Sequence, residues 1–437
     1  MIKILKENKS IYWVWLTMVG IISISVIITP YLSLVAFFIF IIYSIFKPIN
    51  HSCVLLFGLL PFANLFKIEA GVTSLFTICE LIVVILAVIK ERKIKWDFLI
   101  SLLLFIAYIS VLSIGNFNIL TIIKQIIGFY LIYLVTSKAN KKDVIHIAYL
   151  LSASVILMMV LSLNETYFQY IEPYLTDLNY LANSPGSISK IMRSGGFLGD
   201  PNYCSMLIII TVSLLCSLYY HHKIKTEFWI YIAFLIPLGF FTYSKSYLLC
   251  ISALILFLFL FVLLPKHRGW AVVFSLTMVI VVSMALSGKI EVINLIVERF
   301  TSGDITTGRT ALNKAYLTYI RENPKVLFFG EGIGADRIST LVNNVHNIYI
   351  EGLFKLGIVG CIFYVFALAF SVRYKTNIKS KRKLADFIPL AFVLVLFCVL
   401  AGITMYELPF YVSIAVLALN FNSLNENNLN DNNLVRR

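Results

Sequence analysis

Residues 202–220 read NYCSMLIIITVSLLCSLYY and contain no charged side chain. A helix of this length crosses the ~30 Å hydrocarbon core of a bilayer. The whole 437-residue chain has the same character, because 60% of its residues are hydrophobic, 13% are charged and its mean hydropathy is +0.90. Soluble domains contain about 45–50% apolar and about 25% charged residues. The composition therefore predicts an all-α polytopic membrane protein and excludes a soluble enzyme, a nucleic-acid-binding protein and a disordered chain.

Apolar runs of similar length predict about 12–14 transmembrane helices in a single integral membrane domain, residues 1–437. The predicted spans are residues 11–29, 31–46, 52–66, 74–89, 97–114, 118–136, 143–163, 202–220, 228–243, 247–264, 269–287, 346–370, 385–404 and 407–421. The basic N-terminus is followed by a long apolar run without a small-residue cleavage site, which indicates a retained first helix.

The net charge of +14 has an ordinary cause in a membrane protein, because cytoplasmic loops are enriched in lysine and arginine. A cytoplasmic N-terminus assigns most basic residues to the cytoplasmic side and makes residues 422–437 a cytoplasmic tail. Two long segments then lie outside, a first outer loop at 164–201 and a second at 288–345 with amphipathic helices. Since every cytoplasmic connection is short, we expect the active face to be the outer face of the membrane.

The seven cysteines are scattered through apolar runs, without a CxxC or a Cys/His spacing. This pattern predicts neither a disulfide framework nor a zinc site. We expect no cofactor and no nucleic-acid partner.

His346 is the only one of the six histidines that this topology places outside. It opens HNIYIEGLFKLG (346–357), which predicts a helix in which Glu351 and Lys355 form an i,i+4 ion pair, and Gly357 lets a neighbouring helix approach closely. A histidine suits proton transfer near neutral pH. The alternative is an interfacial histidine that caps the helix.

The segment GRTALNKAYLTYIREN (308–323) has a helical apolar stripe and predicts a helix lying against the membrane, with Arg309 in its first turn. A cation is unfavourable at a helix N-terminus, so this position indicates a bound anion; a lipid head group or a carboxylate partner are the alternatives. The following NPKVLFFGEGIGA (323–335) lacks the pattern of a phosphate-binding loop and predicts a tight turn.

The first outer loop ends in RSGGFLGDPNYCS (193–205), which predicts a turn and then a helix with an Asp or Asn cap. A short outer turn, FTYSKS (241–246), carries Lys245. The outer cations are Arg193, Lys245 and Arg309, with Arg299, Arg321 and Arg337 less well placed. Cations and one base suit a reaction in which a hydroxyl is the nucleophile and a diphosphate is the leaving group.

These motifs resemble the O-antigen ligase and Wzy-type polysaccharide polymerase superfamily over about residues 190–370. The resemblance rests on four groups: His346, Asn347, Ile350 and Gly357; Asn323, Pro324, Gly330 and Gly332; Arg309; and Arg193, Gly196, Asp200, Pro201 and Asn202. The family commonly has Ser-Arg where this chain has Ser244-Lys245, and lysine keeps the charge but loses the bidentate fork of arginine.

The resemblance implies a membrane glycosyltransferase of the GT-C type in a bacterial cytoplasmic (inner) membrane. Such an enzyme uses undecaprenyl-diphosphate-linked glycans without a nucleotide sugar or a metal. The resemblance also implies that His346 is the catalytic base, that Arg309 and Lys245 hold the diphosphate, and that Arg193 helps to bind substrate. It assigns substrate-binding or structural roles to Asn347, Asn202, Asp200, Arg321, Gly330 and Gly332.

The leading hypothesis is a polymerase for capsule, O-antigen or exopolysaccharide repeat units, with a flippase and a chain-length regulator as candidate partners beside membrane lipid. The first alternative is an O-antigen ligase that transfers finished glycan to a lipid A core or to protein. The second is a lipid-linked oligosaccharide flippase, which predicts ionisable residues at mid-membrane and related halves. Its candidates are Glu80, Lys124 and the Glu351/Lys355 pair, and the sequence shows no repeat.

Overall fold

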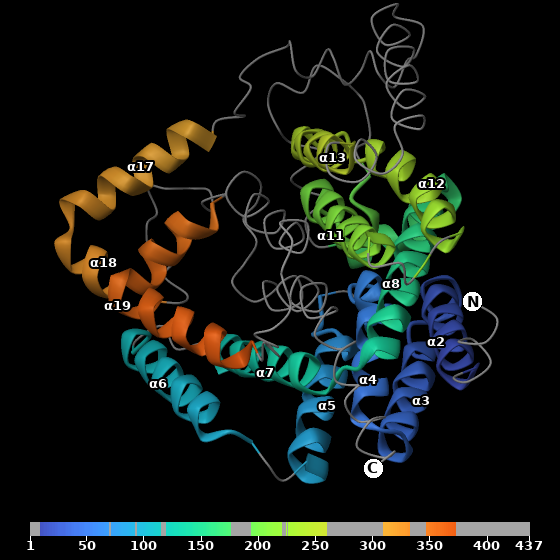
Figure 1. Cartoon of the computed structure of the whole chain (residues 1–437), viewed down its shortest axis with the longest axis horizontal. Coiled ribbons are helices and arrows are strands. Elements are labelled where there is room, and N and C mark those ends of the chain that lie inside the picture. The colour runs from blue at the N-terminus through green and yellow to red at the C-terminus, as the bar shows by residue number, and fades with distance from the viewer. Residues whose placement is uncertain are drawn as a thin grey trace, which may run out of the picture.

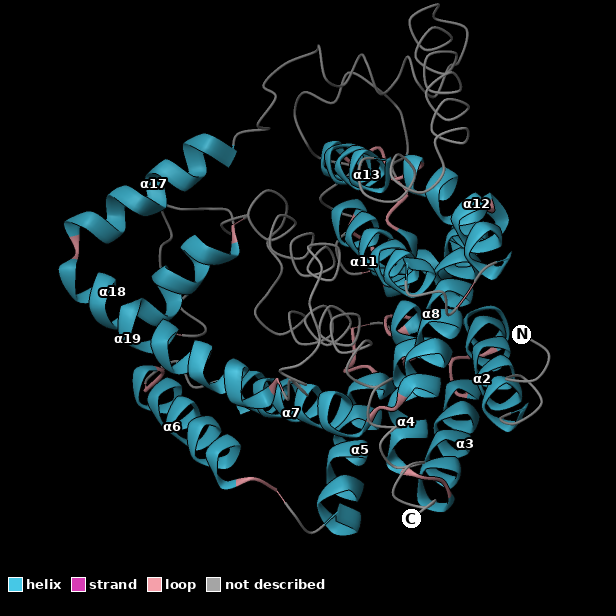
Figure 2. Cartoon of the chain, in the orientation of Figure 1, coloured by secondary structure: helices cyan, strands magenta, loops and turns pink. Residues whose placement is uncertain are grey.

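The computed structural model describes residues 9–69, 71–91, 94–114, 119–175, 194–220, 224, 226–259, 309–332 and 347–372. Within these residues the chain forms helices and no strands (Figure 2), which confirms the all-α polytopic class. The predicted spans 269–287, 385–404 and 407–421, the tail 422–437 and much of both long outer loops lie outside the described residues.

Each predicted span within the described residues contains a helix. The elements are α2 (Lys9–Ile28), α3 (Leu32–Phe46), α4 (Ile49–Leu59), η1 (Leu60–Phe62), α5 (Leu75–Glu91), α6 (Trp96–Leu112), α7 (Ile119–Lys138), α8 (Lys141–Ser162), α9 (Glu165–Ile171), η2 (Glu172–Tyr174), η3 (Gly196–Leu198), α11 (Pro201–Tyr220), α12 (Thr226–Phe240), α13 (Lys245–Leu258), α17 (Arg309–Glu322), α18 (Pro324–Phe329) and α19 (Ile348–Ser371). Four of the described helices, α2, α8, α11 and α19, are long and apolar enough to cross a membrane.

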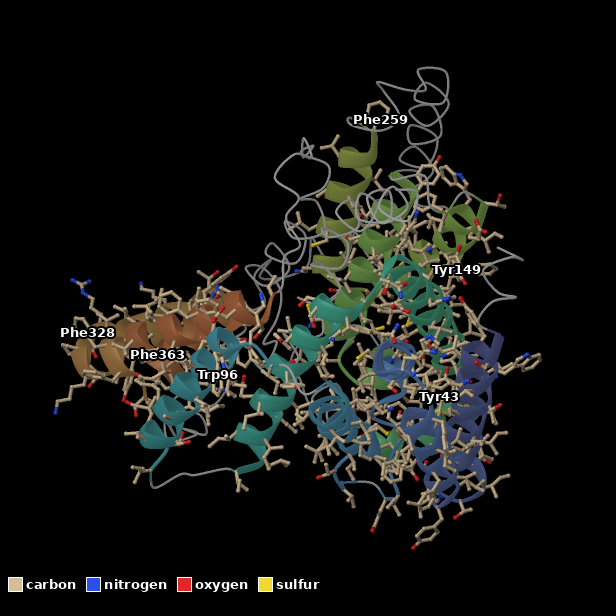
Figure 3. The ribbon with its side chains drawn as sticks, turned by 60° about the horizontal axis from the view of Figure 1, so that its bottom comes forward. Tyr43, Trp96, Tyr149, Phe259, Phe328 and Phe363 are labelled. Atoms are coloured by element: carbon tan, nitrogen blue, oxygen red, sulfur yellow. The ribbon has the colours of Figure 1, made fainter. Side chains whose placement is uncertain are left out.

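Helices α2 to α5, α8 and α11 to α13 form the main body of the described structure (Figure 1). Helix α8 lies at its centre and packs against α4, α11 and α12. Its start is fixed by a capping box, in which Asn140 accepts from the backbone N–H of Asp143 and the Asp143 side chain accepts from the backbone N–H of Asn140. Large apolar side chains such as Trp96 remain exposed on the surface, as expected where lipid covers a helix. Figure 3 shows Trp96 and Phe363 in one arm of the molecule and Tyr149 in the main body.

Loops that the sequence assigns to the same side of the membrane contact each other. At one end of the body, Asn50 donates to Asp143 over 2.8 Å. At the other end, Asn64 donates to the carbonyl oxygen of Phe197 over 3.0 Å, and the hydroxyls of Ser162 and Ser194 are 3.2 Å apart. We call this second end the predicted outer end.

The arm is formed by α6, α7, α17, α18 and α19 (Figure 1). The inner half of α19 packs on α7, where the Phe129 and Tyr364 ring centroids are 5.2 Å apart and Thr136 donates to the carbonyl oxygen of Ser371 over 3.1 Å. The outer half of α19 packs on α17 and α18 through a separate apolar cluster of Tyr316, Ile320, Val326 and Phe354.

Candidate active site

Helices α17 and α19 begin at the same end of their shared contact. The ring of Tyr316 lies 5.1 Å from that of Phe354, measured between centroids. Arg309 precedes Tyr316 by about two helical turns, and Asn347 precedes Phe354 by the same number. Figure 1 shows the two helices starting side by side. The fold therefore brings the start of α17, which carries Arg309, close to the start of α19.

Asn347 is the N-cap of α19. Its side-chain oxygen accepts from the backbone N–H groups of Tyr349, over 3.0 Å, and Ile350, over 3.3 Å. His346 directly precedes this cap in the sequence and lies outside the described residues. Two helix N-termini that start together present two positive dipole ends, an arrangement that favours a bound anion.

The apolar stripe of α17 contacts protein. Leu312, Tyr316, Tyr319 and Ile320 belong to the cluster on α18 and α19, so these helices cover the stripe that the sequence assigned to the membrane surface. The helix covers Arg309–Glu322, close to its predicted extent. The prediction of a helix from the amphipathic pattern is confirmed. The prediction that its apolar stripe lies on the membrane was wrong, because such a stripe can equally pack on another helix.

Helix α19 is interrupted at Gly357, whose φ of 64° and ψ of −177° are not helical. The expectation of a continuous helix through this position was wrong. The interruption frees carbonyl groups, which are satisfied from elsewhere: the N–H groups of Glu331 and Gly332 donate to Phe354 and Lys355 over 2.9 and 3.0 Å. Tyr108 of α6 donates to the carbonyl oxygen of Leu356 over 3.0 Å. Irregular backbone at membrane depth is stable only when its polar groups are paired in this way.

The glycines after α18 are required by this contact. Gly330 has a φ of 78°, and a Cβ there would collide with the carbonyl oxygen of Lys355. Gly332 has a φ of 101°, which only glycine adopts at little cost. Glu331 between them accepts from the Tyr319 hydroxyl over 2.9 Å, and burial together with Glu331 raises the pKa of Tyr319. The two glycines therefore allow the segment after α18 to lie close to the outer half of α19. The backbone of this segment is hydrogen-bonded to α19.

Gly357→Ala is expected to destabilise the protein by about 1–3 kcal/mol, because alanine is strained at this φ and its Cβ would meet the backbone of Phe328. Thermal unfolding of the detergent-solubilised protein, followed by size-exclusion fluorescence, measures the effect. Gly20→Ala in α2 is the matched control, since a Cβ at Gly20 has nothing within 4 Å. Equal melting temperatures in the two variants would contradict this role for Gly357.

A second group of predicted residues meets at the predicted outer end. Asp200 caps α11, where its carboxylate accepts from the backbone N–H of Asn202 over 2.6 Å. The side-chain oxygen of Asn202 in turn accepts from the hydroxyl of Ser244 over 3.1 Å. Ser244 caps α13, and Lys245 is the first residue of that helix. Asp200 and Asn202 thus make structural contacts that fix the turn carrying Lys245.

The loop before α11 also lies against this turn. The N–H of Ser194 donates to the carbonyl oxygen of Phe241 over 3.0 Å. Arg193 is the preceding residue and lies outside the described residues. The fold therefore joins two motifs, 193–202 and 241–246, that are far apart in the sequence. Figure 1 shows the starting ends of α17 and α19 directed towards α11 and α13.

Arg321 is not brought to the start of α17. It lies in the last turn of the helix, exposed and about 18 Å along the axis from Arg309. Arg299 and Arg337 lie outside the described residues.

Sequence reasoning missed Tyr108 and the capping role of Ser244. Tyr108 lies in an apolar run in which nothing distinguishes it from a tyrosine of the membrane interface. Ser244 could have been found, because a serine directly before an apolar run is a typical helix cap. The predicted ion pair between Glu351 and Lys355 is confirmed, with a separation of 2.6 Å.

The described residues contain no group of three or more His, Cys, Asp or Glu side chains that could hold a metal ion. Independence from metal remains a prediction.

No curated protein and no solved structure matches the chain. Residues 228–365 match the family model Wzy_C, described as O-antigen ligase. The matched segment contains the turn with Lys245, helices α17 and α18, and the start of α19. It supports an activity of the ligase or polymerase type, and with it a membrane glycosyltransferase. The match confirms, over about a third of the chain, the resemblance to the O-antigen ligase/Wzy superfamily seen in the sequence.

Proposed function

We propose that the chain is a polysaccharide polymerase of the GT-C type, which joins undecaprenyl-diphosphate-linked repeat units at the outer face of the cytoplasmic membrane. The observation that carries the proposal is that α17 and α19 begin at the same end of their shared contact. It places the backbone of Arg309 near Asn347, the cap that directly follows His346. A diphosphate-binding cation and a proton acceptor are the two groups that this transfer needs.

In the proposed reaction, a hydroxyl oxygen at the non-reducing end of one repeat unit attacks the anomeric carbon of the growing chain. The new C–O bond forms as the bond from that carbon to the diphosphate breaks, and the bonding electron pair leaves with the diphosphate. His346 takes the proton of the hydroxyl. Arg309 and Lys245 stabilise the negative charge that develops on the leaving group, with Arg193 as a further substrate contact. Attack from the face opposite the leaving group inverts the configuration.

The ligase alternative uses the same donor and the same chemistry, and differs in its acceptor, a lipid A core or a protein. The flippase alternative would require the charged residues within the membrane to serve transport. Glu351 and Lys355, two of its candidates, neutralise each other in an ion pair beside the interruption of α19, and this pairing favours a structural role.

A reconstitution with one substrate tests the polymerase. We expect the purified protein in nanodiscs, supplied only with undecaprenyl-diphosphate-linked repeat unit in buffer containing EDTA, to produce a ladder of extended chains on a gel. The ladder is expected because one lipid-linked unit can be both donor and acceptor, and no metal takes part. A protein that makes product only after a lipid A core is added is a ligase, and a protein that makes none under either condition contradicts the proposed chemistry.

A further inference from the structure

The hydroxyl of Tyr108 in α6 joins two other helices. It donates to the carbonyl oxygen of Phe329, the last residue of α18, over 2.8 Å, and to that of Leu356, directly before the interruption of α19, over 3.0 Å. A phenolic hydroxyl has one proton, so the two carbonyl groups share it. Three helices therefore meet at a single hydroxyl group.

The ring of Tyr108 is held in place by the inner half of α19. It lies against Gly360, where a Cβ would collide with the ring, and its centroid is 5.5 Å from that of Phe363. Because a tyrosine side chain has only two torsion angles, packing that fixes the ring also fixes the hydroxyl. The end of α18 is therefore bonded to a point that is fixed relative to α6 and the inner half of α19.

Helices α17 and α18 contribute none of their described side chains to the main apolar core. That core includes Ile348 and Leu356, so it anchors both ends of the outer half of α19. The side chains of α17 and α18 instead contact α19 through the small cluster around Tyr316 and Phe354. Apolar contacts are not directional, so this cluster holds α17 on α19 without fixing the angle between them.

Hydrogen bonds at the end of α18 fix this angle. The N–H groups of Glu331 and Gly332 donate to consecutive carbonyl groups of α19, those of Phe354 and Lys355. Two bonds to neighbouring residues of one helix still allow rotation about the line that joins them. The bonds of Tyr108 come from a different helix, α6, and this third point of attachment opposes the rotation.

A small rotation at the end of α18 would be amplified at Arg309. Helix α17 covers Arg309–Glu322, about 20 Å along its axis, and α18 follows its far end. A rotation of about 10° would therefore move the start of α17 by about 3–4 Å. An error of about 1 Å in the position of a catalytic group can lower the rate about 10²-fold.

We propose that Tyr108 is a positioning residue of the candidate active site, whose hydroxyl fixes the position of Arg309 relative to the start of α19. It acts through α18 and α17 and not by contact with the substrate. This inference rests on the proposed function, in which Arg309 holds the diphosphate leaving group.

Tyr108→Phe tests the proposal, because this variant loses the hydroxyl and keeps the ring. We expect the rate of chain extension at saturating substrate, in the one-substrate reconstitution, to fall about 10- to 100-fold. Tyr167→Phe is the matched control, since the Tyr167 hydroxyl donates to the carbonyl oxygen of Ser23 over 2.9 Å, between α9 and α2. This control loses the same kind of hydrogen bond and should keep the wild-type rate.

A distance measurement separates positioning from general destabilisation. Spin labels are attached at Lys314→Cys in α17 and Leu103→Cys in α6, both exposed positions, in a variant whose seven native cysteines are replaced. Pulsed electron paramagnetic resonance should give a shifted or broader label-to-label distance when Tyr108→Phe is added. Addition of Tyr167→Phe should leave the distance unchanged.

Equal rates in the two tyrosine variants would overturn the inference. A lower rate in Tyr108→Phe with an unchanged distance would also overturn it, because the hydroxyl would then not act through the position of α17. Failure of the proposed function gives a different result, in which the wild-type protein itself makes no chains. Failure of this inference leaves a wild-type protein that makes chains and a Tyr108→Phe variant that makes them at the same rate.

Discussion

Chain extension is expected to fall by about 10²- to 10⁴-fold in His346→Ala, the usual contribution of a general base. The attacking sugar hydroxyl is a weak nucleophile, and without the imidazole it loses the proposed acceptor of its proton. The variant should still insert into the membrane, because His346 precedes the helix cap and the cap itself is Asn347. Lipid-linked single repeat units should accumulate. The measurement is chain length by gel electrophoresis in cells and in the one-substrate reconstitution.

His51→Ala is the matched control. His51 lies in α4, near the end of the body opposite the predicted outer end, and its ring nitrogen is 3.4 Å from the hydroxyl of Tyr43. This control should give chains of normal length. Normal chains in His346→Ala would remove the proposed base. Labelling that places residue 346 on the cytoplasmic side would do the same.

The positions of the helices could be predicted from the sequence because each span is a local property. A run such as 202–220 has to satisfy its backbone hydrogen bonds internally once it is in lipid, and only a helix does so within one segment. Helix α11 covers Pro201–Tyr220, within one residue of the prediction. The ion pair of Glu351 and Lys355 was also predictable, since residues at i and i+4 always lie on the same face of a helix.

The interruption of α19 could not be predicted, because it depends on partners distant in the sequence. Gly357 lies in an apolar run, and glycine is common in continuous transmembrane helices. The interruption is stable because Glu331, Gly332 and Tyr108 supply donors to the freed carbonyl groups. Similarly, the stripe of α17 predicted an apolar contact but could not indicate whether lipid or α19 makes it.

In the proposed site, too, the local features could be predicted from the sequence and the long-range contacts could not. The local pattern identified Asp200-Pro201-Asn202 as a helix start and Lys245 as part of a short turn. It could not show that Asn202 bonds to Ser244 and so joins the two motifs, because this contact links residues 42 positions apart.

Arg309→Ala is expected to lower chain extension by about 10²- to 10³-fold, the usual cost of removing one donor that stabilises a developing negative charge. A cation at the start of a helix is unfavourable against the helix dipole, and the diphosphate proposed to bind there would compensate for it. Arg309→Lys should recover part of the activity, since lysine retains the charge and loses the bidentate geometry. Rates of chain extension at saturating substrate, in the one-substrate reconstitution, compare the variants.

Lys314→Ala is the matched control for this experiment, because Lys314 is an exposed cation of the same helix and lies more than one turn beyond Arg309. If both variants lose activity equally, the requirement is for the general positive charge of α17. If Arg309→Ala alone loses activity and Arg309→Lys regains part of it, the requirement is for a cation at the helix start. Only the second result agrees with a diphosphate held between the first turns of α17 and α19, beside the base that precedes Asn347.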